Sequence, residues 1–168
     1  MLIKNRVNLN KYRADLDRLF VQCFDGARCS DSDPSDLRSI ELLDAKVVSH
    51  ASVQKRPFDF IKRDDVETYI LGYVCTDLEH RGKGFASKTI REIAGHMSGK
   101  PWILVLHCED SKVEFYQKHG FEIVSEKGSY FRNGKIEIED GPVMVLCSIP
   151  DLKNIIVRGS VLHLGDEY

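Results

Sequence analysis

Hydrophobic and polar residues alternate along the chain in two patterns, helical spacing and short apolar runs, which together predict a domain of mixed helices and strands. Apolar residues at helical spacing predict helices over residues 10–24 and 85–97, and a short helix after Pro34 that carries Leu37, Ile40 and Leu43. Asn133-Gly134 predicts a tight hairpin turn. Apolar runs predict strands over residues 47–54, 58–62, 66–76, 102–107, 122–124, 130–132, 135–138 and 143–149.

A glycine-rich segment joins the strand ending at Thr76 to the helix that begins near Phe85. It reads Leu78-Glu79-His80-Arg81-Gly82-Lys83-Gly84-Phe85-Ala86. Two glycines allow a tight turn that gathers several backbone N–H groups, and the following helix directs its partial positive charge to the same place. With the cationic side chains of Arg81 and Lys83, the segment predicts a pyrophosphate site. The alternative is a tight strand-to-helix connection without a ligand.

The letters Arg-x-x-Gly-x-Ala resemble the acetyl-CoA signature of the GCN5-related N-acetyltransferase (GNAT) family, and differ from a P-loop or a dinucleotide-binding turn. A second segment, residues 113–121, is similar to the same family's tyrosine-bearing helix followed by Gly-Phe. The resemblance implies an α/β fold with a mixed, mostly antiparallel central sheet flanked by helices. We expect a single domain over residues 1–168, which is an ordinary length for one core.

The resemblance also implies an activity, the transfer of an acetyl group from acetyl-CoA directly to a primary amine. Tyr116 matches the family's motif tyrosine and is the expected general acid for the departing sulfur; the alternative is a core aromatic residue with a hydrogen-bonded hydroxyl group. The expected cofactor-binding residues are Val74, Cys75, Thr76, Arg81, Gly82, Lys83, Gly84, Phe85, Ala86 and Ser87.

The general base is not fixed by the sequence. Each candidate is better explained as a solvated loop residue or a helix cap than as a base, and His80 is better explained by packing or by contact with the edge of CoA. The candidates are Asp77, Glu79, His107, Glu109 and Asp110.

The C-terminal part, beginning with Asp140-Gly141, resembles the aminoglycoside 2′-N-acetyltransferases. That resemblance implies acceptor binding by Asp140, Asp166 and the carboxylate of Tyr168, with Asp31 or Asp33 in support, and a tail (residues 150–168) that lines the acceptor site. The alternatives are an ordinary turn and a solvated acidic tail. The chain departs from this branch at Tyr168, where the branch has Trp, and at Gly72, where it has Glu. Another amino sugar or a polyamine therefore remains an alternative acceptor.

The charge and cysteine content of the chain limit the kinds of partner and cofactor that we expect. A net charge of -2 without a large basic cluster argues against binding to nucleic acid or an anionic membrane, and no segment is apolar enough to span a bilayer. Five scattered cysteines without a C-x-x-C pair favour reduced thiols and a cytoplasmic location, and the histidines show no ligand spacing, so no metal is expected. We expect a small-molecule amine acceptor, with a homodimer compatible with the family. Two alternatives are a protein or peptide N-acetyltransferase and a non-catalytic CoA-binding regulatory module.

Overall fold

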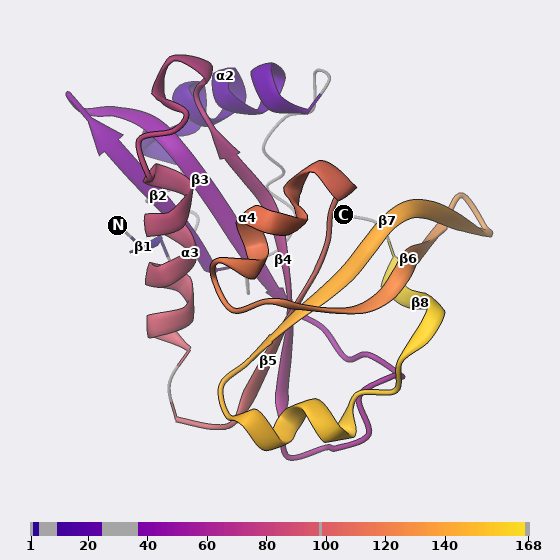
Figure 1. The fold of residues 1–168 in the computed structure, drawn as a ribbon. Helices are drawn as coiled ribbons and strands as arrows, with labels where there is room; N and C mark the ends of the chain where they lie inside the picture. Colours follow the sequence, from indigo (N-terminus) through magenta and orange to yellow (C-terminus); the bar gives the residue numbers. More distant parts are fainter. Residues whose placement is uncertain (1, 4–9, 25–36, 98, 167–168) are drawn as a thin grey trace. The chain divides into compact units, whose positions relative to one another are not determined.

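The computed structural model describes residues 2–3, 10–24, 37–97 and 99–166. Its strands form a mixed, mostly antiparallel sheet whose hydrogen-bonded neighbours follow the order β1-β2-β3-β4-β5-β7-β6-β8. The chain divides into two compact units, residues 1–55 with 71–98 and residues 56–70 with 99–168, and β4 (Glu67–Thr76) contributes to both. This is the α/β architecture that the sequence predicts (Figure 1).

The first unit holds two helices against antiparallel strands. Its elements are β1 (Leu2–Ile3), α2 (Arg13–Cys23), β2 (Leu37–Leu43), β3 (Lys46–Lys55), the end of β4, a 3-10 turn η1 (Leu78–His80) and α3 (Phe85–His96).

The two helices of this unit cover opposite faces of β2 and β3 (Figure 1). Ile40 of β2 packs with buried Leu16 and Phe20 of α2. The neighbouring Ser39 and Glu41 face α3, where the Ser39 hydroxyl donates to Glu92 at 2.8 Å and Lys88 pairs with Glu41 at 2.5 Å. Since successive side chains of a strand point to opposite faces, β2 separates an apolar layer from a polar one.

The second unit is built on a long twisted hairpin. Its elements are the start of β4, β5 (Trp102–His107), η2 (Asp110–Lys112), α4 (Val113–Gln117), β6 (Glu122–Arg132), β7 (Lys135–Cys147), η3 (Pro150–Ile155) and β8 (Gly159–Asp166). Strand β4 pairs with β5 in parallel, β7 lies antiparallel between β5 and β6, and β8 adds to β6 in parallel.

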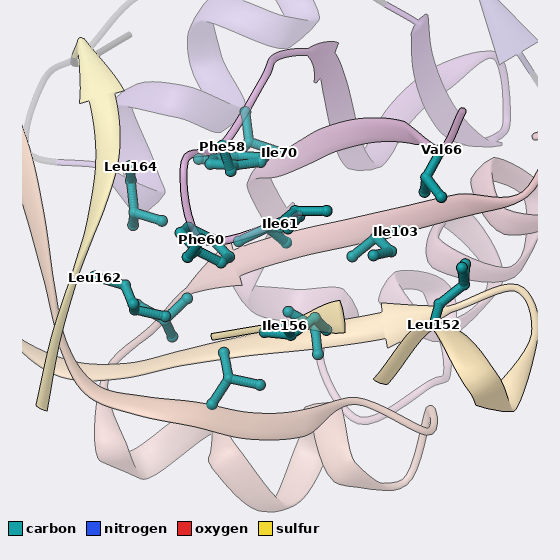
Figure 2. Packing of buried hydrophobic residues seen from close by; sticks show 14 of the residues in the cluster. Phe58, Phe60, Ile61, Val66, Ile70, Ile103, Leu152, Ile156, Leu162 and Leu164 are labelled. Atoms are coloured by element: carbon teal, nitrogen blue, oxygen red, sulfur yellow. The ribbon is translucent and has the colours of Figure 1, made fainter. Parts of the chain in front are cut away.

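An apolar cluster packs inside this second unit (Figure 2). Ile103 and Val143, from the central strands, are fully buried in it, and η3 and β8 cover it with Leu152 and Leu164. The segment 56–70 closes the cluster with Phe58, Phe60, Ile61 and Val66. Leu152, Ile156, Leu162 and Leu164 of the C-terminal tail are therefore part of the core.

Two predicted elements are wrong. Residues 37–43 form strand β2 and not a helix, because the polar residues between its apolar positions are buried and bonded to α3. Residues 58–62 contain a turn and an isolated bridge from Ile61 to Ile156, although their apolar side chains are buried as a strand's would be.

The remaining predicted elements are confirmed with changed bounds. Asn133 (φ +50°) and Gly134 (φ +78°) form the predicted turn, and the short strands predicted on either side of it merge into β6 and β7.

Candidate acyl-CoA site

The glycine-rich segment forms a bend whose two glycines both have left-handed backbone conformations. Gly82 has φ +75° and Gly84 has φ +81°, and α3 begins at the next residue, Phe85. An L side chain is strained in this region, which explains why glycine occupies both positions.

The space beside these two glycines is open. A Cβ atom added to either Gly82 or Gly84 would meet nothing within 4 Å. The first hydrogen bond of α3 runs from the N–H of Lys88 to the carbonyl of Gly84, so the N–H groups of Phe85 and Ala86 precede the ladder of the helix. Gly84 itself offers no side chain to cap them. An anion fits this concentration of backbone donors and positive helix end.

Arg81 lies along the end of β4 with its guanidinium group exposed at the bend. Its Nε donates to the carbonyl of Thr76 at 3.3 Å, and its Nη2 lies 3.8 Å from the sulfur of Cys23. Lys83 is also exposed. The bend therefore combines main-chain donors with two cationic side chains.

Asp77 stabilises the entry to this bend. It is buried, accepts a hydrogen bond from the N–H of Glu79 at 3.1 Å as the cap of η1, forms an ion pair with Arg18, and lies 3.3 Å from Nδ1 of His80. The hydrogen bond from Arg18 is the main cause that holds the pKa of Asp77 below its usual value. Among the two readings left open for Asp77, these contacts favour the cap over the general base.

Strand β4 is distorted immediately before the bend. Tyr73 has φ +50°, a left-handed conformation inside a strand, and both Cys75 and Thr76 are buried where regular alternation would bury one of them. Side chains of β3 bond the carbonyls of this stretch: Ser52 to Gly72 at 3.4 Å, His50 to Tyr73 at 2.9 Å and Ser49 to Cys75 at 2.8 Å. This is a bulge-like irregularity near Val74 to Thr76, three of the expected cofactor-binding residues.

His50 and Arg18 were not singled out by the sequence, although both shape this region. His50 contacts Tyr73, 23 residues away, and Arg18 pairs with Asp77, 59 residues away. No local motif signals partners so distant, and an isolated histidine in an apolar strand gives little indication by itself.

Tyr116 lies in the second unit on the short helix α4. The residue is 9% exposed, and its ring contacts Phe115 and Phe121 edge to face. Gly120, with φ +85°, ends the helix as predicted, and the N–H of Phe121 returns to the carbonyl of Tyr116. The short turn therefore holds the tyrosine firmly.

The base candidates of the second unit differ in their surroundings. His107 is half-buried at the end of β5, and its Nε2–H donates to the carbonyl of Gly141 at 3.0 Å, while Nδ1 lies 3.6 Å from a carboxylate oxygen of Glu139. Glu109 and Asp110 are exposed beside η2. In the first unit, Glu79 is exposed, and the His80 ring packs edge to face on Phe85.

The predicted acceptor residues are only partly described. Asp140 is exposed and forms an ion pair with Lys127 at 2.6 Å, which lowers the pKa of the carboxyl group and offsets its charge. Asp166 ends β8, with its backbone opposite Phe131. Tyr168, Asp31 and Asp33 lie outside the described residues.

The part of the chain that the structure describes contains no group of three His, Cys, Asp or Glu side chains arranged to hold a metal ion. In the same residues, no helix is long and apolar enough to cross a membrane.

One family model matches part of this chain, and solved structures share its fold. Residues 44–123 match the family model described as the acetyltransferase (GNAT) domain, and the chain has the GNAT fold. This match covers β3, β4, the glycine bend, α3, β5 and the Tyr116 helix.

Three solved structures illustrate the likeness of the fold. Arabidopsis thaliana Naa50, in complex with the bisubstrate analogue CoA-Ac-MVNAL, aligns with a TM-score of 0.62 and 16% identity over 87% of this chain and 97% of that one. An aminoglycoside 6′-N-acetyltransferase complexed with coenzyme A aligns with a TM-score of 0.56 and 16% identity over 89% of this chain and 98% of that one. Escherichia coli ElaA aligns with a TM-score of 0.55 and 19% identity over 83% of this chain and 90% of that one. No curated protein sequence matches this chain.

Proposed function

We propose that this protein is an acetyl-CoA-dependent N-acetyltransferase that acetylates a primary amine of a small cationic acceptor. The observation that carries the proposal is the bend at Gly82 and Gly84, which combines open space, unused helix donors and Arg81. A diphosphate is the chemical group that such a bend suits best. The matching family model and the two CoA-containing neighbours support the same donor.

The proposed chemistry is direct transfer. The amine nitrogen attacks the thioester carbonyl, and backbone N–H groups near Val74, Cys75 and Thr76 stabilise the negative charge that grows on the carbonyl oxygen. The carbon–sulfur bond then breaks, and the Tyr116 hydroxyl donates its proton to the departing sulfur. The attacking nitrogen loses one proton as it becomes an amide, and that proton returns through solvent to the Tyr116 oxygen. The phosphates of the donor would be held by the bend from Arg81 to Ser87.

A matched pair of glycine variants tests the donor site. Gly84→Glu places a bulky anion where the diphosphate is expected, and we expect the dissociation constant for CoA, measured by titration calorimetry, to rise about 100-fold or more. Gly134→Glu is the control, because Gly134 has φ +78° and is also open to 4 Å, but lies in the β6–β7 turn. Both variants carry similar backbone strain, so they should lose similar stability. Equal CoA affinity in the two variants would contradict the proposal.

A protein or peptide acceptor is the second candidate. It is favoured by the likeness to Naa50, whose structure contains a peptide-bearing bisubstrate analogue. The ion pair between Asp140 and Lys127 weakens the case for an aminoglycoside, because it offsets a carboxylate expected to face a cationic sugar. Release of free thiol from acetyl-CoA, measured with aminoglycosides, polyamines, amino sugars and peptides, separates these classes. Binding of CoA without turnover of any amine would favour the regulatory module.

A further inference from the structure

Two cysteines and an arginine meet where the end of α2 packs against the end of β4. Cys23 is partly exposed and packs on the apolar cluster that contains buried Cys75. The Cys75 thiol is hydrogen-bonded to the sulfur of Cys23, which also lies 3.7 Å from the carbonyl oxygen of Thr76 and 3.8 Å from Nη2 of Arg81. The sulfur of Cys23 thus contacts both the Cys75 thiol and the guanidinium group of Arg81.

These neighbours distinguish Cys23 from the other described cysteines. The hydrogen bond from Cys75 lowers the pKa of Cys23 most, burial opposes it, and the hydrogen bond and charge of Arg81 lower it further, to about 6. Burial instead raises the pKa of Cys108 and of Cys147 to about 11. At neutral pH Cys23 is therefore largely a thiolate, which is the reactive form of cysteine, whereas the other two are thiols.

We propose that Cys23 and Cys75 are an oxidisable dithiol, in which Cys23 reacts with hydrogen peroxide and Cys75 completes a disulfide. In the first step the Cys23 thiolate attacks one peroxide oxygen, the O–O bond breaks, and the departing hydroxide takes a proton to become water. Cys23 becomes a sulfenic acid.

In the second step the Cys75 sulfur attacks the Cys23 sulfur, the S–O bond breaks and an S–S bond forms. The hydroxyl leaves as water with the proton of Cys75. Two thiols and one peroxide thus give a disulfide and two waters, with the peroxide as the two-electron oxidant. Buried Cys75 needs no access to solvent for this step, because it already contacts Cys23.

The position of the pair connects it to the glycine bend. Arg81 belongs to that bend, and oxidation removes from its guanidinium group the negative sulfur that lies against it. The proposal itself does not depend on acetyl-CoA, because it is drawn from contacts within the first unit alone.

Peptide mapping tests the disulfide directly. A Cys29→Ser background is treated with about one equivalent of hydrogen peroxide, the remaining thiols are blocked, and the protein is digested without reductant. We expect a linked peptide pair that contains Cys23 and Cys75, with Cys108 and Cys147 still reduced. A product with both thiols intact, or with Cys23 carried to sulfinic acid and Cys75 reduced, overturns the proposal.

A second measurement tests the electrostatic contacts in the reduced protein. The rate of Cys23 alkylation by iodoacetamide is followed against pH, and the wild-type midpoint is expected near the pKa of about 6. Arg81→Gln should move the midpoint up by about one pH unit, since the cation that favours the thiolate is lost. Lys83→Gln removes an equal charge from the same bend. Lys83 is not among the groups that lower the pKa of Cys23, so this variant should leave the midpoint in place. An unchanged midpoint in Arg81→Gln contradicts the proposal, whether or not the variant binds CoA.

Discussion

His50 shows how one buried side chain fixes the conformation of the strand beside it. Its Nδ1–H donates to the carbonyl of Tyr73 and its Nε2 lies 3.4 Å from Nη1 of Arg38, so the neutral ring has one donor and one acceptor in use. The ring also packs edge to face on Phe20, which contacts Tyr73 in turn. These contacts hold Tyr73 in the left-handed region that an isolated tyrosine avoids.

The buried His50 predicts a dependence of stability on pH. Burial, and then the charge of Arg38, lower its pKa to about 3, against about 6.5 in the unfolded chain. Between these values the unfolded chain binds more protons, so the free energy of unfolding falls as the pH drops below 6.5, by at most about 1.4 kcal/mol per pH unit from this residue. Chemical denaturation at pH 6 and pH 5 measures the slope.

His50→Asn is the control for that slope, since it keeps an N–H donor near the carbonyl of Tyr73 but cannot titrate. We expect a lower stability at pH 7 and a shallower fall between pH 6 and pH 5. A slope equal to that of the wild type would assign the pH dependence to other groups.

Tyr116 carries the residue-scale prediction about catalysis. Tyr116→Phe removes the proposed proton donor, so kcat should fall about 100-fold while the dissociation constant for CoA stays within about 2-fold. Tyr130→Phe makes the same change at a residue that is also 9% exposed, and it should leave kcat nearly unaltered. Steady-state kinetics with a responsive amine measures both; equal rates for wild type and Tyr116→Phe would remove this side chain from the mechanism.

Sequence alone predicted the residues whose role depends on the local backbone. Gly82, Gly84 and Gly120 follow from turn chemistry, and each has the positive φ that such turns need. The contacts of Arg18, His50 and Cys23 depend on strands and helices far along the chain, for which a single sequence carries no spacing signal.

At the scale of elements, the hydrophobic pattern succeeds where the buried positions are apolar. It places α3 and β5 within a residue of their observed bounds. It fails at β2, because Ser39 and Glu41 are buried under α3, where they bond to Glu92 and Lys88, and the pattern cannot distinguish them from solvent-facing residues. Polar residues buried with partners are therefore the main source of error here.

Strand β8 provides the prediction at this scale. Half-buried Arg56 donates from Nη1 to the carbonyl of Leu164 at 2.9 Å, and a Cβ atom on Gly165 would lie 3.4 Å from the same guanidinium nitrogen. Arg56→Met keeps much of the apolar stem but loses the donor, so the free energy of unfolding should fall by about 1–2 kcal/mol. Amide exchange in β8 should become faster.

Arg158→Met is the matched control for Arg56. Arg158 also donates from Nη1 to a main-chain carbonyl at 2.9 Å, that of Ile123, but it is exposed. Its loss should cost about 0.5 kcal/mol or less. Equal losses in the two variants, measured by urea unfolding, would contradict a special role for Arg56 in holding the C-terminal strand.

At the scale of the whole molecule, the fold was predictable because the glycine bend and the Tyr116 helix follow one another along the chain as they do in the GNAT fold. The acceptor substrate was not predictable. Acceptor choice depends on how side chains from separate loops and the tail come together, and ion pairs such as that of Asp140 with Lys127 alter the charge that a sequence suggests. Many of the charged side chains are neutralised in such pairs, so the net charge of -2 does not identify an acidic site by itself.

The tail offers the whole-molecule prediction. Truncation after Gly165 removes Asp166, Glu167 and Tyr168 with their carboxylates, while Leu162 and Leu164 stay in the core. If these carboxylates bind a cationic acceptor, KM for polyamines and aminoglycosides should rise by about 10-fold or more, with CoA affinity unchanged. Thiol-release kinetics and calorimetry measure the two quantities. Unaltered turnover of every cationic acceptor would refute a role for the tail.

The open space beside Gly84 and its left-handed backbone determine which enantiomer of alanine this position would accept. An L-alanine there would meet no steric obstacle within 4 Å, so only the cost of a left-handed backbone, about 1–2 kcal/mol, resists it. A D-alanine, introduced by chemical ligation, has the mirror-image preference and would make the same bend more rigid without that cost. A comparison of L-alanine and D-alanine at this position thus distinguishes the effect of the backbone conformation from the effect of filling the open space beside Gly84. Ordinary mutagenesis at this position cannot make that distinction.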